Sequence, residues 1–179
     1  GRISYAGAEA ASEGVNPAVM REAVAIQMTW PGAPTVYYGD EAGLCGFTDP
    51  DNRRTYPWGR EDYQMIDFHR VMIRIHKNYE VLKTGSLGFL WNDYQGLCYA
   101  RFSRKEQMIV IINNQAESRD VEIQLWQAGI SRLADTKLKR IVVTSAEGFT
   151  EEPEEYTATA GILKITMPAF GAMVLHHKN

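Results

Sequence analysis

The chain has 179 residues, of which 45% are hydrophobic and 23% are charged, a composition typical of an ordinary globular protein. The formal net charge is −3 and the basic residues are scattered singly, which argues against nucleic acid and against an anionic membrane as partners. No apolar run approaches the roughly 20 residues of a membrane helix. Cysteine and histidine do not occur at metal-ligand spacing, so neither a metal nor another cofactor is expected.

The first part of the chain predicts one helix, one strand and a long loop. Asn16 as an N-cap and Pro17 at the first helical position predict a helix that runs to Trp30. Residues 33–38 include the β-branched and aromatic run Thr-Val-Tyr-Tyr, entered through proline and left through glycine, which predicts a buried strand. Residues 40–60 carry no periodicity and are expected to form an ordered loop.

A second amphipathic helix is predicted over 61–82, with Gly85 placed to cap its end. The period then becomes strand-like, which predicts an antiparallel β-sandwich. One strand between two helices cannot form a sheet, so residues 1–83 are interpreted as the tail of a larger α/β structure and residues 84–179 as an all-β domain. The fold class is therefore α+β, and the expected strands are residues 97–103, 108–113, 121–125, 138–143, 162–167 and 172–175.

The segment Pro-Gly-Ala-Pro-Thr-Val-Tyr-Tyr-Gly-Asp-Glu-Ala-Gly, residues 31–43, resembles the α-amylase superfamily, glycoside hydrolase family 13. There it forms the last strand of a catalytic (β/α)8 barrel. The continuation at residues 49–54 and 56–58 resembles the neopullulanase, cyclomaltodextrinase and α-glycosidase branch. The resemblance implies that residues 17–30, 35–38 and 61–82 are the seventh helix, eighth strand and eighth helix of the barrel, followed by the family's C-terminal β-sandwich.

The resemblance also decides which catalytic residues to expect. The family uses an aspartate after strand four, a glutamic acid after strand five and an aspartate in a His-Asp pair after strand seven. The chain contains no His-Asp dipeptide, so no catalytic residue is assigned, and the chain is expected to be inactive alone. Asp40 and Glu41 follow a barrel-type strand, but adjacent strand residues point in opposite directions. Glu41 resembles a structural residue that anchors the loop.

Four loop residues are the candidates for contact with substrate. Asp49 and Arg53 offer charge-assisted hydrogen bonds to vicinal sugar hydroxyls, and the resemblance places them near glucose units on the non-reducing side of the scissile bond. The alternative is a salt bridge that only stiffens the loop, with Arg54 structural. Tyr56 and Trp58 could stack on pyranose rings or could fill the loop's own small core.

The remaining polar and aromatic candidates have ordinary structural interpretations. The four histidines are expected to be solvated or satisfied, the two cysteines to be free thiols with a disulfide left open, and the aromatic residues of the sandwich to pack in its core rather than form a carbohydrate platform. The leading hypothesis is a part of a retaining α-glucan hydrolase or transglycosylase. The alternatives are a carbohydrate-binding module or a purely structural module that self-associates through its exposed apolar faces. The histidines, cysteines and sandwich aromatics considered above are His69, His76, His176, His177, Cys45, Cys98, Tyr99, Phe102, Trp91 and Trp126.

Overall fold

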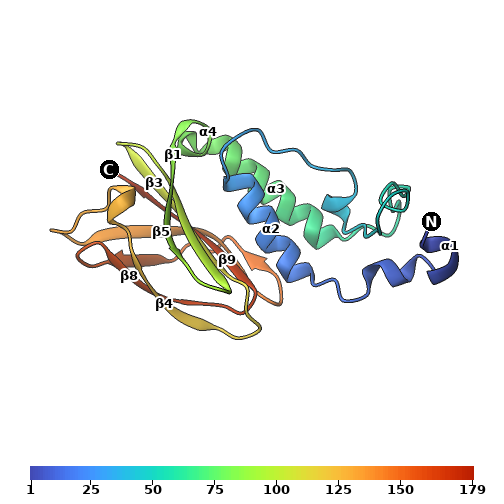
Figure 1. Ribbon diagram of the computed structural model, residues 1–179. Coiled ribbons are helices and arrows are strands. Elements are labelled where there is room, and N and C mark those ends of the chain that lie inside the picture. The colour runs from blue at the N-terminus through green and yellow to red at the C-terminus, as the bar shows by residue number, and fades with distance from the viewer.

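A computed structural model describes residues 1–179 as a β-sandwich with two long helices on one of its faces (Figure 1). The helices are α1 Ile3–Ala6, α2 Pro17–Thr29, α3 Tyr63–Asn78 and α4 Glu80–Thr84, with single 3-10 turns at Glu9–Ser12, Asp40–Ala42 and Trp126–Ala128. The strands are β1 Ser86–Asn92, β2 Gly96–Phe102, β3 Glu106–Asn113, β4 Arg119–Gln124, β5 Thr136–Thr144, β6 Phe149–Thr150, β7 Glu155–Ala158, β8 Ile162–Met167 and β9 Gly171–Lys178. This confirms the predicted α+β class and all six predicted strands.

The sandwich consists of a large and a small antiparallel sheet. The large sheet has the order β1-β2-β3-β9-β5-β6, with β7 also paired to β5, and the small sheet is the pair β4-β8. The central strands β3 and β9 pair in continuous register from Glu106 opposite Lys178 to Asn113 opposite Gly171. The large sheet therefore has one face toward the small sheet and the other toward the helices.

Two hydrophobic cores lie on the two faces of the large sheet, because alternate side chains of a strand point to opposite faces. On β3, Val110 packs with α2 and α3, whereas Ile109 and Ile111 pack toward the small sheet. On β9, Val174 and Leu175 divide in the same way. The central strands read as nearly continuous apolar runs because both of their faces are buried.

The two long helices begin where their caps predict. The Asn16 side chain accepts a hydrogen bond from the Ala18 N–H at 2.9 Å, with Pro17 as the first helical residue. The Asp62 side chain accepts one from the Met65 N–H at 3.0 Å. The predicted helix over residues 17–30 is confirmed.

The structure corrects two of the predicted elements. Residues 33–38 are not a strand, because no other strand of the chain lies beside them to complete a ladder. The expected single helix over 61–82 is broken at Tyr79, which has an extended backbone and packs its ring on His176 at 4.8 Å between centroids. The Gly85 N–H caps α4 through the Val81 carbonyl, with φ at −70° rather than in the left-handed region.

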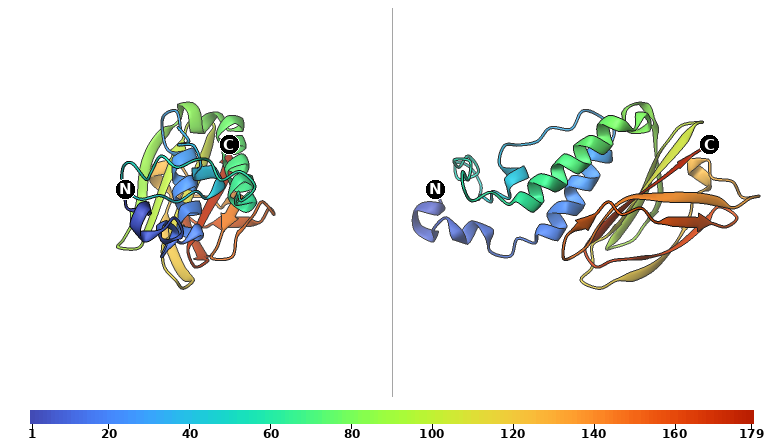
Figure 2. Two further views of the ribbon diagram at one scale, coloured as in Figure 1. Left: turned by 90° about the vertical axis from the view of Figure 1, so that its right-hand side faces the viewer. Right: turned by 180° about the vertical axis from the view of Figure 1, so that it is seen from behind.

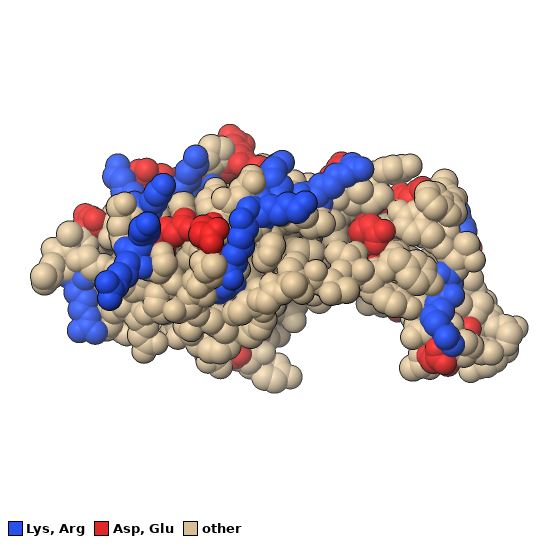
Figure 3. Space-filling view, turned by 90° about the horizontal axis from the view of Figure 1, so that it is seen from above, with Lys and Arg blue, Asp and Glu red and all other residues tan.

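The molecule is elongated, with the sandwich at one end and residues 1–16 and the 40–62 loop at the other (Figure 2). Basic and acidic side chains are interspersed on the face seen from above (Figure 3). None of the helices combines the length and the apolarity that a membrane crossing requires. The boundary between a 1–83 unit and an 84–179 unit stays a prediction.

Candidate functional site

The candidate site is the loop of residues 40–62, which connects the irregular segment after α2 to the start of α3. The Asp62 N–H donates to the Ala42 carbonyl at 2.9 Å, which closes the loop at its base. Within the loop, the Glu41 carboxylate accepts a hydrogen bond from the Gly39 N–H at 2.8 Å. This contact suits the expected anchoring role of Glu41, which stays a prediction.

Arg54 holds the middle of the loop together, as its expected structural role requires. Its guanidinium donates to the carbonyl of Cys45, and its own carbonyl accepts a hydrogen bond from the Tyr38 hydroxyl at 2.7 Å. A further contact comes from the N-terminal segment, because the Ile3 N–H donates to the Asp51 carboxylate at 2.9 Å. The turn at residues 45–54 is thus tied on two sides.

Asp49 and Arg53 form an ion pair of 2.8 Å on the surface of this turn. Their side chains are 67% and 62% exposed, respectively, so both groups can still accept or donate hydrogen bonds to a ligand. An ion pair this exposed contributes about 0–1 kcal/mol to stability, too little to explain the turn's conformation. Both charged groups of the pair are therefore accessible at the surface of the turn.

Tyr56 and Trp58 lie together, with ring centroids 4.6 Å apart and planes inclined by 52°. Trp58 is 76% exposed, so it does not plug a core of the loop. Tyr56 is half-buried, and desolvation together with the carboxylates of Glu41 and Glu61 raises the pKa of its hydroxyl. The two rings offer apolar surface of the kind that stacks on pyranose faces.

The carboxyl of Asp40 is partly desolvated and lies near Glu41 and His69. Burial raises the pKa of Asp40, Glu41 raises it further, and His69 opposes both effects. No group of three or more histidine, cysteine, aspartate or glutamate side chains is arranged to hold a metal ion.

The other candidates are accounted for by packing, with one correction. His69 and His76 contact the carbonyls of Met65 and Met28 through Nδ1. His176, in contrast, has a carboxylate partner that was not expected from the sequence. Its Nε2 lies 2.8 Å from Glu106 Oε2, and 70 residues separate the two in the chain. Both cysteines are free thiols. Of the sandwich aromatics, Tyr99 is buried and the other three, Phe102, Trp91 and Trp126, are partly buried.

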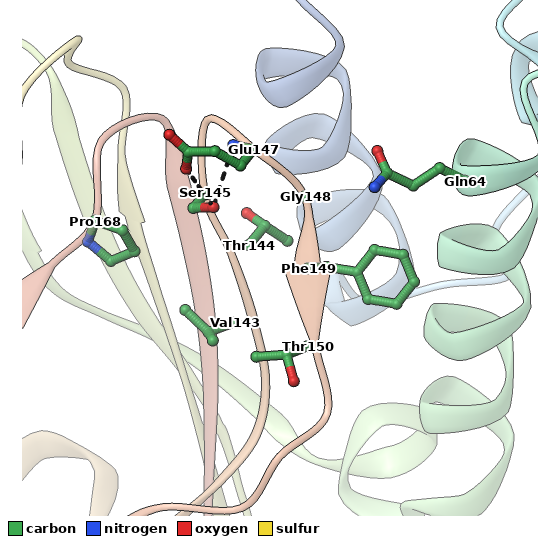
Figure 4. Close-up of a pocket in the computed structure, with 9 residues that line it drawn as sticks. All are labelled: Gln64, Val143, Thr144, Ser145, Glu147, Gly148, Phe149, Thr150 and Pro168. Carbon is green, nitrogen blue, oxygen red and sulfur yellow. Dashed lines mark hydrogen bonds between the residues drawn. The ribbon is translucent and has the colours of Figure 1, made fainter.

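A cavity that no sequence pattern indicates lies where the β5–β6 hairpin meets α3 (Figure 4). Gln64 of α3 reaches toward the hairpin, which contributes Glu147 and Phe149. Nothing in the local sequence pairs these residues, because about 80 positions separate α3 from the hairpin. Only the packing of α3 on the sheet brings them together.

Comparisons with known proteins give consistent matches over most of the chain. The amylopullulanase of Thermoanaerobacterium saccharolyticum is 32% identical over 167 residues, which are 87% of this chain and 12% of the relative. Neopullulanase 2 of Thermoactinomyces vulgaris is 31% identical over 166 residues, 90% of this chain and 26% of the relative. No protein-family model matches. The chain spans only 8% to 26% of the length of these and similar curated relatives.

Solved structures agree with these matches. The debranching enzyme of Nostoc punctiforme superposes with a TM-score of 0.68 at 26% identity, over 90% of this chain and 31% of that one. The α-amylase of Geobacillus thermoleovorans, in complex with acarbose, gives 0.75 at 21% identity over 92% and 34%. The matches confirm the family resemblance carried by residues 31–60.

Proposed function

We propose that this chain, which corresponds to the C-terminal part of an α-amylase-superfamily enzyme, contributes outer sugar subsites and a stabilising β-sandwich to a retaining α-glucan hydrolase. The substrate of the whole enzyme is an α-glucan or maltooligosaccharide with α-1,4 or α-1,6 linkages. The observation that supports the proposal most strongly is the exposed Asp49–Arg53 ion pair on the same loop as the Tyr56–Trp58 aromatic pair. Relatives of this chain carry the names amylopullulanase, neopullulanase and cyclomaltodextrinase, which supports an α-glucan as the substrate.

The chemistry of these residues suits an outer subsite rather than a catalytic one. A carboxylate and a guanidinium fork together accept and donate hydrogen bonds to neighbouring hydroxyls of one sugar. Aromatic rings fix the orientation of a pyranose through its apolar face. A retaining mechanism needs two carboxyls about 5 Å apart flanking the scissile bond. We assign no such pair in this chain, so it binds sugar without cleaving it.

Two assays test this proposal on the purified chain. A chromogenic maltooligosaccharide should show no turnover above buffer, and measurable turnover would refute the statement that the chain is inactive alone. Calorimetric titration with maltoheptaose should show weak binding that Arg53→Ala reduces by about tenfold, as expected for a charge-assisted contact. Arg70→Ala is the matched control, because Arg70 also forms an exposed ion pair, with Asp67.

A purely structural module is the second candidate, and one observation favours it. Val36, Tyr37 and Tyr38 are exposed in a segment that has no strand partner. Exposed apolar surface beside unpaired backbone promotes association. If the chain is a purely structural module, sedimentation velocity should show dimers or larger species. Tyr37→Ser, which removes one of the exposed rings, should convert them to monomers. A monomer at all concentrations, together with maltoheptaose binding, contradicts it.

A further inference from the structure

We propose that the cavity between the β5–β6 hairpin and α3 is a second saccharide-binding site, separate from the 40–62 loop, and that its ligand is a neutral α-glucan segment. The cavity measures about 380 Å³, within the range of small-ligand sites. The identity of the sugar rests on the proposed function. The existence of the cavity is independent of the proposed function, because none of the residues that line it belongs to the 40–62 loop.

The lining combines apolar groups with several hydrogen-bonding groups. Phe149 points from β6 toward α3, where one side of its ring packs on Phe68 with centroids 5.1 Å apart, and Pro168 lies on the other side of the hairpin (Figure 4). Gln64, Glu147 and Thr150 contribute an amide, a carboxylate and a hydroxyl. A pyranose ring needs this combination, because it presents apolar faces and a rim of hydroxyls that both donate and accept.

The charges of the lining favour a neutral ligand. Glu147 is the single charged residue among the nine that line the cavity. Its Oε2 accepts a hydrogen bond from the Ser145 hydroxyl at 3.0 Å, so Oε1 remains available as an acceptor. The carboxylate forms charge-assisted hydrogen bonds with sugar hydroxyls. The guanidinium of Arg21 lies behind Gln64 and Ser145 and opposes the charge of Glu147, so the local charges nearly balance.

Arg21 of α2 holds the two sides of the cavity in place. Its Nη1 donates to Gln64 Oε1 at 3.3 Å, and its Nη2 donates to the Ser145 carbonyl at 3.0 Å. Arg21 is only 2% exposed, so these contacts are shielded from water. Because the carbonyl oxygen of the Gln64 amide is occupied by Arg21, its NH2 group remains as a donor. The amide is thus oriented before any ligand arrives, which lowers the entropic cost of binding.

Gly148 allows this close approach of the helix to the hairpin. A Cβ atom at position 148 would lie 2.9 Å from Gln64 Nε2, so a side chain there would displace the amide. The backbone of Gly148 does not have a positive φ, and alanine can therefore adopt its conformation. Gly148→Ala thus perturbs the donor without removing it.

The test is an NMR titration of the full chain with maltoheptaose that follows the side-chain amide signals of Gln64 and the backbone amide signals of residues 145–150, which remain observable in Gln64→Leu. We expect these signals to shift on saturation, and Gln64→Leu and Gly148→Ala each to weaken the affinity of this site by about fivefold or more. Gln127→Leu, an exposed glutamine without a hydrogen-bond partner, should leave the affinity unchanged. Thermal melts establish that each variant is folded. If Gln64→Leu does not fold, Gly148→Ala provides the test, because it displaces the Gln64 amide without removing it.

The outcomes separate this proposal from the one for the loop. With Arg53→Ala, shifts at Gln64 should persist while those at residues 49–58 vanish. Shifts at residues 49–58 without any at Gln64 overturn the hairpin site and leave the proposed function intact. Shifts at Gln64 with sulfate but not with maltoheptaose identify an anion site, and that result also overturns the proposal.

Discussion

Arg101 Nη1 donates a hydrogen bond to the carbonyl of Thr29 at 3.0 Å, which joins strand β2 to the last turn of α2 across 72 residues of sequence. The same guanidinium donates to the carbonyls of Leu82 and Gly85, each at 2.9 Å. The last carbonyls of a helix lack partners within the helix and carry its negative dipole end. The cation therefore satisfies the ends of α2 and α4 together and attaches both to the large sheet.

Replacing this cation should be costly. Arg101 is 1% exposed, so Arg101→Met leaves three carbonyls without their donor in a buried region. We expect a loss of about 3–5 kcal/mol in the free energy of unfolding, measured by urea denaturation. Arg104→Met, at an exposed arginine of the next turn, should change it by less than about 0.5 kcal/mol. Equal effects of the two substitutions would contradict this account of the junction.

The helices and the sandwich should unfold together because they share one core. Phe68 of α3 is fully buried in a cluster that includes Tyr99 of β2 and Val174 of β9. Phe68→Ala should cost about 3–5 kcal/mol and lower the single transition seen by far-ultraviolet circular dichroism. Tyr63→Ala, at an exposed aromatic of the same helix, is the control. Two separate transitions, with only the first shifted, would refute a shared core.

Glu22 should make stability depend on pH. Its carboxyl is 3% exposed, neither oxygen has a hydrogen-bond partner, and burial raises its pKa from 4.5 to about 8. Between these two pKa values, the Glu22 carboxyl keeps a proton in the folded state that it has released in the unfolded state. The free energy of unfolding therefore falls as the pH rises through this range. The slope of this contribution is up to about 1.4 kcal/mol per pH unit.

The corresponding variant is Glu22→Gln, compared with the parent by urea unfolding at pH 5 and pH 8. The glutamine does not titrate, so its advantage over the parent should grow from pH 5 to pH 8. Glu117→Gln, at an exposed glutamate, should follow the parent at both values. If the stability difference between Glu22→Gln and the parent is the same at pH 5 and pH 8, Glu22 is not buried as a neutral acid.

Local sequence signals predicted the elements that depend on local chemistry. Asn16 and Pro17 gave the start of α2, and the alternating segments gave six strands of the sandwich. Strand β1 was overlooked because Gly88 weakens its β-propensity and a bulge between Phe89 and Trp91 breaks the alternation. Residues 33–38 have strand propensity, but a strand also needs a neighbour, which propensity cannot supply.

The candidate site, like the fold, was predictable only where its contacts are local in the sequence. The loop pair Asp49 and Arg53 is four residues apart and visible as a pattern, and the structure shows the ion pair. The partners of Arg21, Arg101 and His176 are between 16 and 124 residues distant, so only the packed fold identifies them. Long-range polar contacts of this kind leave no periodic signal in a single sequence.

The central claim is that residues 49–58 bind an α-glucan. Its most direct test is a ¹⁵N–¹H correlation spectrum of the chain titrated with maltoheptaose. The account predicts saturable shifts at the backbone amides of residues 49–58 and at the indole N–H of Trp58, both lost in Arg53→Ala while the rest of the spectrum is preserved. Millimolar saccharide that leaves these signals unmoved would contradict the claim.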